Sequence, residues 1–132
     1  MEKRNGVTVI DDTYNANLAS TLAALDYLFD IPVTGKRHFI FGDMLELGDA
    51  SEDHHRQVGR AVSERGVDQF LCYGPESAAA AEAANGIKVS HFNDKSSLGT
   101  AVKDSVSKGD VALFKASRGI ALESVIKEVF GD

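Results

Sequence analysis

Five apolar segments of strand length alternate along this chain with segments that have the periodicity of helices. The expected strands cover residues 7–10, 38–41, 68–73, 87–92 and 110–114, and the expected helices that follow them cover 18–29, 51–65, 76–84, 93–107 and 120–130. Repeated β-α units make neighbouring strands parallel and place helices on both faces of the sheet. The pattern predicts one α/β domain over residues 1–132, a three-layer Rossmann-like fold with a mostly parallel sheet of about five to six strands.

Polar residues concentrate where three of the expected strands end. Because the carboxyl ends of parallel strands lie along one rim of a sheet, segments 11–17, 42–48 and 115–119 should meet there. Open α/β sheets bind their ligands at this rim. The sequence therefore predicts a ligand site built from these three loops.

Charge and composition exclude several classes of partner. The 132 residues carry a formal net charge of −6, which argues against binding of nucleic acid or of anionic membranes, because phosphate contacts need clustered Lys and Arg. No apolar stretch approaches the ~20 residues of a membrane span, so we expect no membrane insertion. The lone cysteine, Cys72, lies in an apolar run and is expected to be a buried thiol, which fits a reducing, cytoplasmic location.

The first rim segment, residues 11–17, carries two carboxylates, a phenol and two carboxamides. Asp12 could accept hydrogen bonds from a ribose diol, and Asn15 could bond a base or a phosphate oxygen. The alternative is structural, with Asn15 or Asn17 capping the next helix and Asp11 holding the turn. A cap needs only one such residue, so the excess of polar groups favours a ligand.

The second rim segment, residues 42–48, has two glycines that bracket two carboxylates and three large apolar residues. Asp43 and Glu46 could hold the ammonium group of a substrate. The alternative is an ordered surface loop with Leu45 and Leu47 packed beneath it. The residues alone do not favour one over the other.

The third rim segment, residues 115–119, carries two cations next to a helix N-terminus. Lys115 and Arg118 would there suit a carboxylate or a phosphate. The alternative is that they neutralise rim carboxylates. Glu123, further along, is more typical of a solvated acid in a first helical turn.

No catalytic or metal-ligating arrangement is legible in the chain. His54 and His55 are adjacent and cannot share one helix face, and Cys72 has no partner, so no metal site is expected. His54 could still reach the rim, because its helix begins there. The sequence has neither a Walker phosphate loop nor a Gly-x-Gly-x-x-Gly fingerprint. It therefore predicts ligand binding without catalytic residues of its own.

Three motifs follow one another along nearly the whole chain. They are Asp11-Asp12-Thr13-Tyr14-Asn15-Ala16-Asn17, Gly42-Asp43-Met44-Leu45-Glu46-Leu47-Gly48 and Lys115-Ala116-Ser117-Arg118, with His55 and Val58-Gly59 before the third. In this order they resemble the C-terminal domain of the Mur ligase family. The resemblance is to the branch that joins D-Ala-D-Ala to UDP-N-acetylmuramoyl-tripeptide (UDP-MurNAc-tripeptide) in peptidoglycan precursor synthesis.

The resemblance implies one domain excised from a three-domain, ATP-dependent amide ligase. ATP would convert the tripeptide carboxylate to an acyl phosphate, which the amine of D-Ala-D-Ala attacks. The N-terminal domain would hold the UDP-sugar, and the central domain would carry the Walker loop and most of the Mg²⁺ ligands. The domain described here would close over the nucleotide and bring the amino substrate, and it would be inactive alone.

The resemblance also assigns residues. Asp12 would bond the ribose of ATP, with Tyr14 and Asn15 near the nucleotide or its phosphates. The residues implied for the dipeptide are Asp43, Lys115, Ser117 and Arg118, with Glu46 and Glu123 as weaker candidates. Because a dipeptide zwitterion needs an anion near its amine and a cation near its carboxylate, our own hypothesis is that Asp43 faces the amine and Arg118 the carboxylate. The family usually has Pro where Leu18 stands and Gly where Ala116 stands, and the second departure matters if that backbone needs a positive φ.

Two rival readings come from other classes of protein. A response-regulator receiver also has five β-α units, an acidic pair after its first strand and a Lys after its fifth. It needs a phosphoacceptor Asp after its third strand, where Cys72-Tyr73-Gly74 stand here. A stand-alone module for a nucleotide or an amino acid would bind its ligand tightly with no other domain present.

Overall fold

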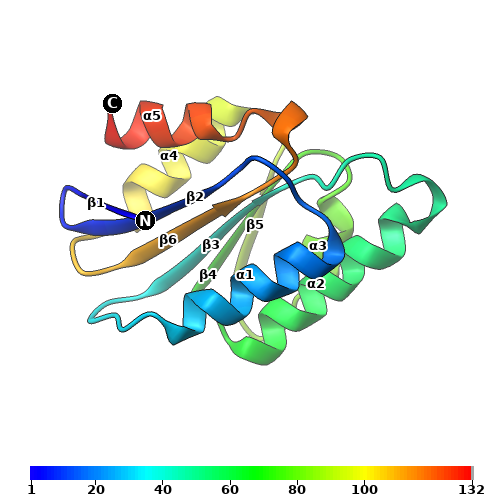
Figure 1. The fold of residues 1–132 in the computed structure, drawn as a ribbon, viewed down its shortest axis with the longest axis horizontal. Coiled ribbons are helices and arrows are strands. Elements are labelled where there is room, and N and C mark those ends of the chain that lie inside the picture. The colour runs from blue at the N-terminus through cyan, green and yellow to red at the C-terminus, as the bar shows by residue number, and fades with distance from the viewer. Residues whose placement is uncertain (132) are drawn as a thin grey trace.

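The strands pair in the order β1-β2-β6-β3-β4-β5 in a computed structural model that describes residues 1–131 (Figure 1). Their bounds are β1 (Glu2–Arg4), β2 (Val7–Asp12), β3 (Arg37–Gly42), β4 (Gln69–Tyr73), β5 (Lys88–Phe92) and β6 (Val111–Lys115). Only β1 runs antiparallel to its neighbour in this sheet of the described residues. The predicted α/β class and mostly parallel sheet are confirmed.

The helices form a layer on each face of the sheet (Figure 1). They are α1 (Leu18–Asp30), α2 (Ser51–Arg65), α3 (Ala78–Ala83), α4 (Lys95–Ser105) and α5 (Glu123–Phe130). The first three cover one face, and α4 and α5 cover the other. No helix within residues 1–131 is long and apolar enough to cross a membrane.

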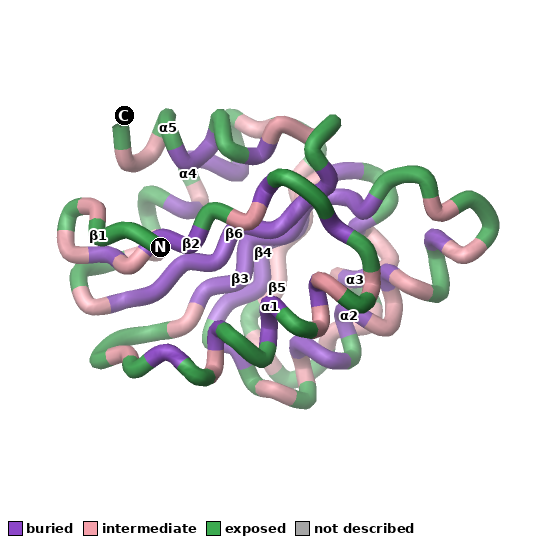
Figure 2. The backbone as a smooth tube through the Cα atoms, viewed as in Figure 1, coloured by how far each residue is buried: buried purple, intermediate pink, exposed green. Residues whose placement is uncertain are grey.

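The central strands are apolar along their whole length because both of their faces are covered. In β3, Phe39 and Phe41 pack towards α1 and α2, whereas Ile40 packs towards α4 and α5. Strand β6 divides in the same way, with Leu113 on the first face and Phe114 on the second. Figure 2 shows this buried centre in purple, and it fixes the sheet from which the rim loops project.

The edge strand β1 is the one strand absent from the sequence prediction, because its residues are polar and show no apolar alternation. It forms a hairpin with β2 through Asn5 and Gly6, both of which have positive φ, 54° and 81°. An Asn-Gly pair is a strong indication of such a turn. This local indication was present in the sequence and would have located the strand.

Helix ends followed the capping rules at some positions and departed from them at others. Asn17 and Asp94 cap α1 and α4 through their side chains, and Gly66 ends α2 in the left-handed region. Ser51 is of a residue type favoured at caps, but it lies inside α2, and Ala50 precedes it at the cap position. The last helix begins at residue 123 rather than 120, because a short 3₁₀ turn over residues 118–120 comes first.

A buried polar network lies at the opposite end of the sheet from the rim. The carboxylate of Asp110 is 2.8 Å from Nε2 of His38, and accepts hydrogen bonds from the backbone N–H groups of Lys36 and Ser107. The Gln69 amide donates to Nδ1 of His38 at 2.8 Å. His38 therefore joins Gln69 to Asp110 through its two ring nitrogens.

We expect Asp110→Asn to lower the free energy of unfolding by about 1–3 kcal/mol at neutral pH. Burial alone raises the pKa of the Asp110 carboxyl, but hydrogen bonds from Lys36, Ser107 and His38, together with the charge of His38, outweigh burial and hold this pKa below its ordinary value. A depressed pKa stabilises the fold above the unfolded value, and this stabilisation is lost as pH falls through the folded value. Urea unfolding from about pH 2 to about pH 7 measures both effects.

In the same urea series, the exposed Asp104→Asn serves as the control. Equal stability of Asp110→Asn and the original protein at all pH values would contradict the assignment.

Candidate ligand-binding site

The carboxyl ends of β2, β3 and β6 bring the three predicted rim segments together (Figure 1). Three hollows open between them. The Asp12 hollow, of about 560 Å³, is lined by Ile10, Asp11, Asp12, Tyr14, Asn15, Ser20, Ala23, Ala24, Tyr27, Leu113 and Lys115. The Glu46 hollow, of about 290 Å³, is lined by Tyr14, Asn15, Ala16, Leu45, Glu46, Ser117, Arg118 and Gly119. The Glu123 hollow, of about 390 Å³, is lined by Asp11, Asp12, Thr13, Tyr14, Arg118 and Glu123.

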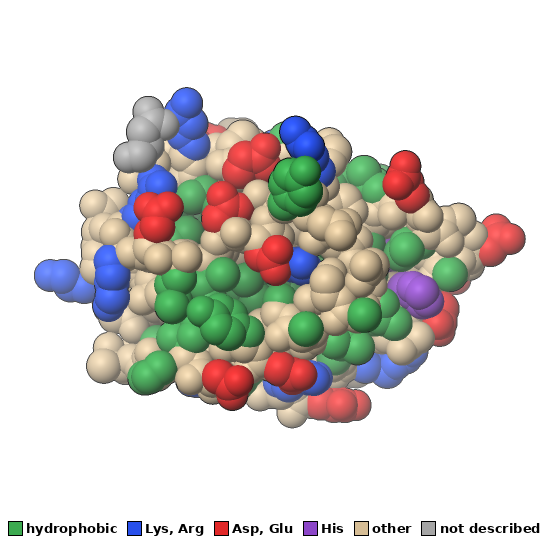
Figure 3. Space-filling model, in the orientation of Figure 1, with side chains coloured by type: hydrophobic (Ala, Val, Ile, Leu, Met, Phe, Trp, Pro, Cys, Tyr) green, Lys and Arg blue, Asp and Glu red, His purple; other side chains and the backbone are tan. Residues whose placement is uncertain are grey.

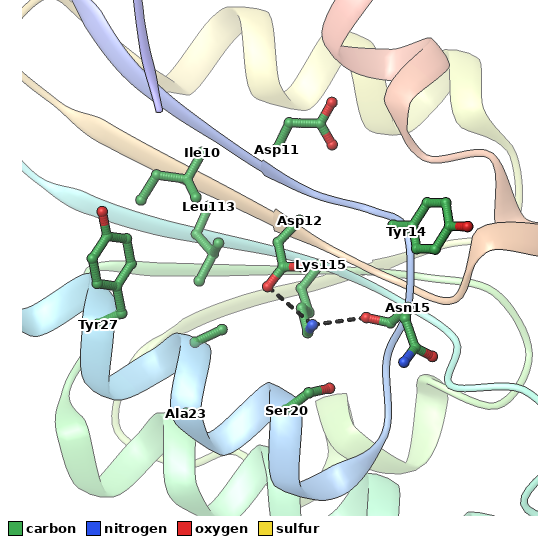
Figure 4. A pocket seen from close by; sticks show the side chains of 11 residues that line it. Ile10, Asp11, Asp12, Tyr14, Asn15, Ser20, Ala23, Tyr27, Leu113 and Lys115 are labelled. Carbon is green, nitrogen blue, oxygen red and sulfur yellow. Dashed lines mark hydrogen bonds and ion pairs between the residues drawn. The ribbon is translucent and has the colours of Figure 1, made fainter.

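The Asp12 hollow has an apolar floor and a charged end (Figure 4). Figure 3 shows apolar side chains gathered over this part of β2 and α1, with acidic side chains at the border. Asp12 closes the charged end, and 41% of its side chain is exposed. The carboxylate therefore has room to accept hydrogen bonds from a ligand.

Lys115 lies beneath this carboxylate, and 3% of its side chain is exposed. Its ammonium Nζ is 2.9 Å from Oδ2 of Asp12 and donates to the backbone oxygen of Asn15 at 2.7 Å (Figure 4). The parallel register of β2 and β6 puts residues 12 and 115 side by side. Lys115 thus fixes Asp12 and the following loop, as the structural alternative for this lysine proposed, and it does not present its charge at the surface.

The loop after β2 divides its polar residues between structure and surface. Oδ1 of Asp11 accepts hydrogen bonds from the hydroxyl and backbone N–H of Thr13, at 2.6 and 3.3 Å, and so holds the turn. Asn17 caps α1 and exchanges two hydrogen bonds with Ser20. Helix capping therefore does not need Asn15, whose exposed side chain lines both the Asp12 and the Glu46 hollows.

Tyr14 and Arg118 form an exposed pair across the rim. Tyr14 is 71% exposed, and the guanidinium carbon of Arg118 lies 5.0 Å from the centre of its ring. Nη1 of Arg118 donates to the Tyr14 hydroxyl at 3.3 Å. Tyr14 lines all three hollows and Arg118 lines two, so this pair stands where the hollows meet.

Asp43 occupies a different position from the one expected of an ammonium ligand. It is 2% exposed, and its carboxylate accepts hydrogen bonds from the backbone N–H groups of Glu76 and Ser77 at 3.1 and 2.7 Å. Gly74 packs against it so closely that a Cβ there would lie 2.5 Å from the carboxylate. Its oxygens hold the loop after β4, and Asp43 lines none of the three rim hollows, so the contacts give this carboxylate a structural role.

Glu46 is the exposed acid of the second rim segment, and its backbone has an unusual φ of 62°. The residues before it are fixed. Leu45 donates its backbone N–H to Oγ of Ser117 at 2.8 Å, and Met44 donates to Nε2 of His55 at 3.1 Å. A left-handed non-glycine residue persists only where the surroundings determine it, and here they direct Glu46 to the rim of its hollow.

His55, rather than His54, reaches the rim. Its Nδ1 donates to the backbone oxygen of Ser51 at 2.7 Å, so Nε2 is the acceptor for Met44. His55 is buried with Val58 and Val62 on one stripe of α2. That spacing of three and seven residues marks His55 as an inward-facing position, which agrees with its place beside Val58-Gly59 in the family resemblance.

Ala116 fits the rim without strain. Positive φ among the described non-glycine residues occurs at Asn5, Glu46 and Ala121 and not at Ala116. A Cβ added to Gly42 would lie 2.8 Å from the Ala116 methyl group. The glycine in β3 therefore provides the room that the alanine after β6 occupies.

The described residues contain no group of three or more His, Cys, Asp or Glu side chains arranged to hold a metal ion. Cys72 is buried as expected, and burial, followed by the charge of Asp43, raises the pKa of its thiol. An inert thiol is consistent with the expected structural role.

A sequence model described as "Mur ligase, glutamate ligase domain" matches residues 1–118. The chain belongs to the Mur ligase family. The UDP-N-acetylmuramoyl-tripeptide–D-alanyl-D-alanine ligase of Bacillus subtilis is 40% identical over 129 residues, and that of Escherichia coli over 121 residues. These alignments cover 95% and 90% of this chain but only 28% and 26% of the ligases.

Solved Mur ligases share the fold. MurF of Thermotoga maritima in complex with ADP superposes with a TM-score of 0.84 and 30% identity, over 98% of this chain and 29% of that one. MurF of Acinetobacter baumannii gives 0.86 and 29%, over 100% and 30%. The predicted family and fold are confirmed, and membership of the family overturns the receiver reading.

Proposed function

We propose that this chain is the nucleotide- and dipeptide-binding domain of an ATP-dependent ligase that adds D-Ala-D-Ala to UDP-MurNAc-tripeptide. The observation that carries the proposal is the pair of adjoining hollows at the rim. One offers a partly exposed carboxylate beside an apolar floor, and the other is lined by one acid and one guanidinium. They share Tyr14 and Asn15 as a common wall.

In the Asp12 hollow, the residues fit a nucleotide. Asp12 would accept hydrogen bonds from the two ribose hydroxyls, and Lys115 would keep that carboxylate oriented. The exposed side chains of Tyr14 and Asn15 would lie along the nucleotide. The related MurF of Thermotoga maritima was solved in complex with ADP, which is consistent with use of ATP in the family. ATP, when bound, supplies the phosphoryl group that activates a carboxylate.

In the Glu46 hollow, the residues fit a dipeptide zwitterion. Arg118 would bind the carboxylate, since a guanidinium can make two parallel hydrogen bonds to it. Glu46 replaces Asp43 as the partner of the ammonium group, because Glu46 is exposed at the hollow and Asp43 is buried. Ser117 is 9% exposed and would support the site by holding the backbone of Leu45.

The remaining work of the reaction belongs to other parts of a longer protein. The chain spans about a quarter of the relatives' length. We propose that a central domain holds Mg²⁺ and the catalytic groups, and that an N-terminal domain holds UDP-MurNAc-tripeptide. This domain would complete the site in the cytoplasm by closing over it and excluding water from the acyl phosphate.

The test is D-Ala-D-Ala-dependent phosphate release by the full-length protein that carries this domain. Arg118→Ala should raise the KM for D-Ala-D-Ala by roughly 10- to 100-fold, as expected for the loss of a charged hydrogen bond. Glu46→Gln should raise the same KM by a smaller factor. The KM for UDP-MurNAc-tripeptide should stay unchanged in both variants.

Arg60→Ala, an exposed arginine of α2 away from the rim, is the matched control. Unchanged KM for D-Ala-D-Ala in both rim variants would refute the dipeptide assignment. Tight binding of ATP or dipeptide by residues 1–132 alone would instead favour the stand-alone module.

A further inference from the structure

Tyr14 is the most exposed of the large apolar and aromatic side chains at the rim. It is 71% exposed, and its ring extends away from β2 towards the segment that follows β6 (Figure 4). Arg118, from that segment, lies over the ring and donates to the hydroxyl. The two residues are 104 positions apart, and their contact adds to the hydrogen bonds of Lys115 and Ser117 that already join the loops after β2 and β6.

If the Tyr14 ring were absent, the side chain of Arg118 could occupy another position, next to the acids of the Glu123 hollow. Besides the Glu46 hollow it lines the Glu123 hollow, together with the carboxylates of Asp11, Asp12 and Glu123. An exposed arginine has high rotamer entropy and is attracted to such acids. A guanidinium stacked on an aromatic face keeps its N–H groups in the plane free for a second partner.

We propose that Tyr14 is a positioning residue for Arg118. It holds the guanidinium at the Glu46 hollow and presents it to the carboxylate of the amino substrate. This inference rests on the proposed function of Arg118. It assigns Tyr14 to the dipeptide side of the site, in addition to its place beside the nucleotide. Orienting the arginine before binding lowers the entropic cost of ordering its side chain when the ligand carboxylate binds.

Tyr14→Leu and Tyr14→Phe in the full-length protein test the proposal. Leu removes the ring and the hydroxyl, and should raise the KM for D-Ala-D-Ala by about two- to fivefold, the factor of an exposed cation–π contact. Phe keeps the ring and should stay closer to the original protein. Because Tyr14 is exposed, both variants should fold.

Two further measurements separate positioning from other roles. In Arg118→Ala, the Tyr14→Leu change should have no additional effect on the KM for D-Ala-D-Ala, since the group it positions is gone. The KM for ATP reports separately on contact of Tyr14 with the nucleotide.

Two results would overturn the inference while leaving the proposed function intact. One is a raised KM for D-Ala-D-Ala in Arg118→Ala with no change in Tyr14→Leu. The other is additive effects of the two changes. A KM for D-Ala-D-Ala that Arg118→Ala leaves unchanged would instead refute the dipeptide assignment itself, and the inference with it.

Discussion

If the proposed function is correct, Lys115→Met should lower kcat/KM for ATP in the full-length protein by roughly 10- to 100-fold, the equivalent of one charged hydrogen bond. Methionine keeps most of the buried length of the side chain but removes the ammonium that joins Asp12 to the backbone of Asn15. Asp12 would then lose its orientation, and the loop that carries Tyr14 would lose its anchor. Steady-state kinetics with ATP varied at saturating D-Ala-D-Ala measures the effect.

A double-mutant cycle shows whether Lys115 acts through Asp12. If it does, the double variant Asp12→Asn with Lys115→Met should lose much less transition-state free energy, measured from kcat/KM for ATP, than the sum of the losses in the two single variants. Lys115→Arg is the conservative control, because it keeps the charge while changing the geometry. Additive losses in kcat/KM for ATP, together with a raised KM for D-Ala-D-Ala, would instead support a direct contact between Lys115 and the substrate, as the sequence analysis suggested.

Whether Lys115 contacts the substrate or acts through Asp12 cannot be predicted from the sequence, because Lys115 lies at the end of a strand. Apolar runs and helical spacing were enough to place β2, β3 and β6 and to bring their ends to one rim. Whether a polar side chain at such an end faces solvent depends on its neighbours in the sheet. Lys115 is buried because its register partner is Asp12 and a loop crosses above it, and no pattern within its own strand contains that information.

The second rim segment shows the same limit through a loop. Asp43 and Glu46 are both acids of one glycine-bracketed motif, and no residue pattern within that motif shows which of them is buried. The structure separates them through Glu76 and Ser77, whose backbone N–H groups come from another part of the chain and take up the Asp43 carboxylate. Capping at Asn17 was predictable, since it depends only on neighbouring residues.

Asp43→Ala should therefore lower the free energy of unfolding by about 2–4 kcal/mol, because it leaves two buried backbone N–H groups without an acceptor and creates a cavity. Equilibrium unfolding in urea measures this loss in residues 1–132. Glu46→Gln, three residues away and exposed, is the matched control and should change stability by less than about 0.5 kcal/mol.

The two acids should thus differ in the assay that each substitution affects, one in urea unfolding and the other in steady-state kinetics. Asp43→Ala should act mainly on stability, and Glu46→Gln mainly on the KM for D-Ala-D-Ala. If Asp43→Ala instead keeps its stability while the KM for D-Ala-D-Ala rises, the carboxylate is free to bind a ligand in the working enzyme. The loop after β4 would then have to release Asp43 when the amino substrate enters, because Glu76 and Ser77 occupy its oxygens here.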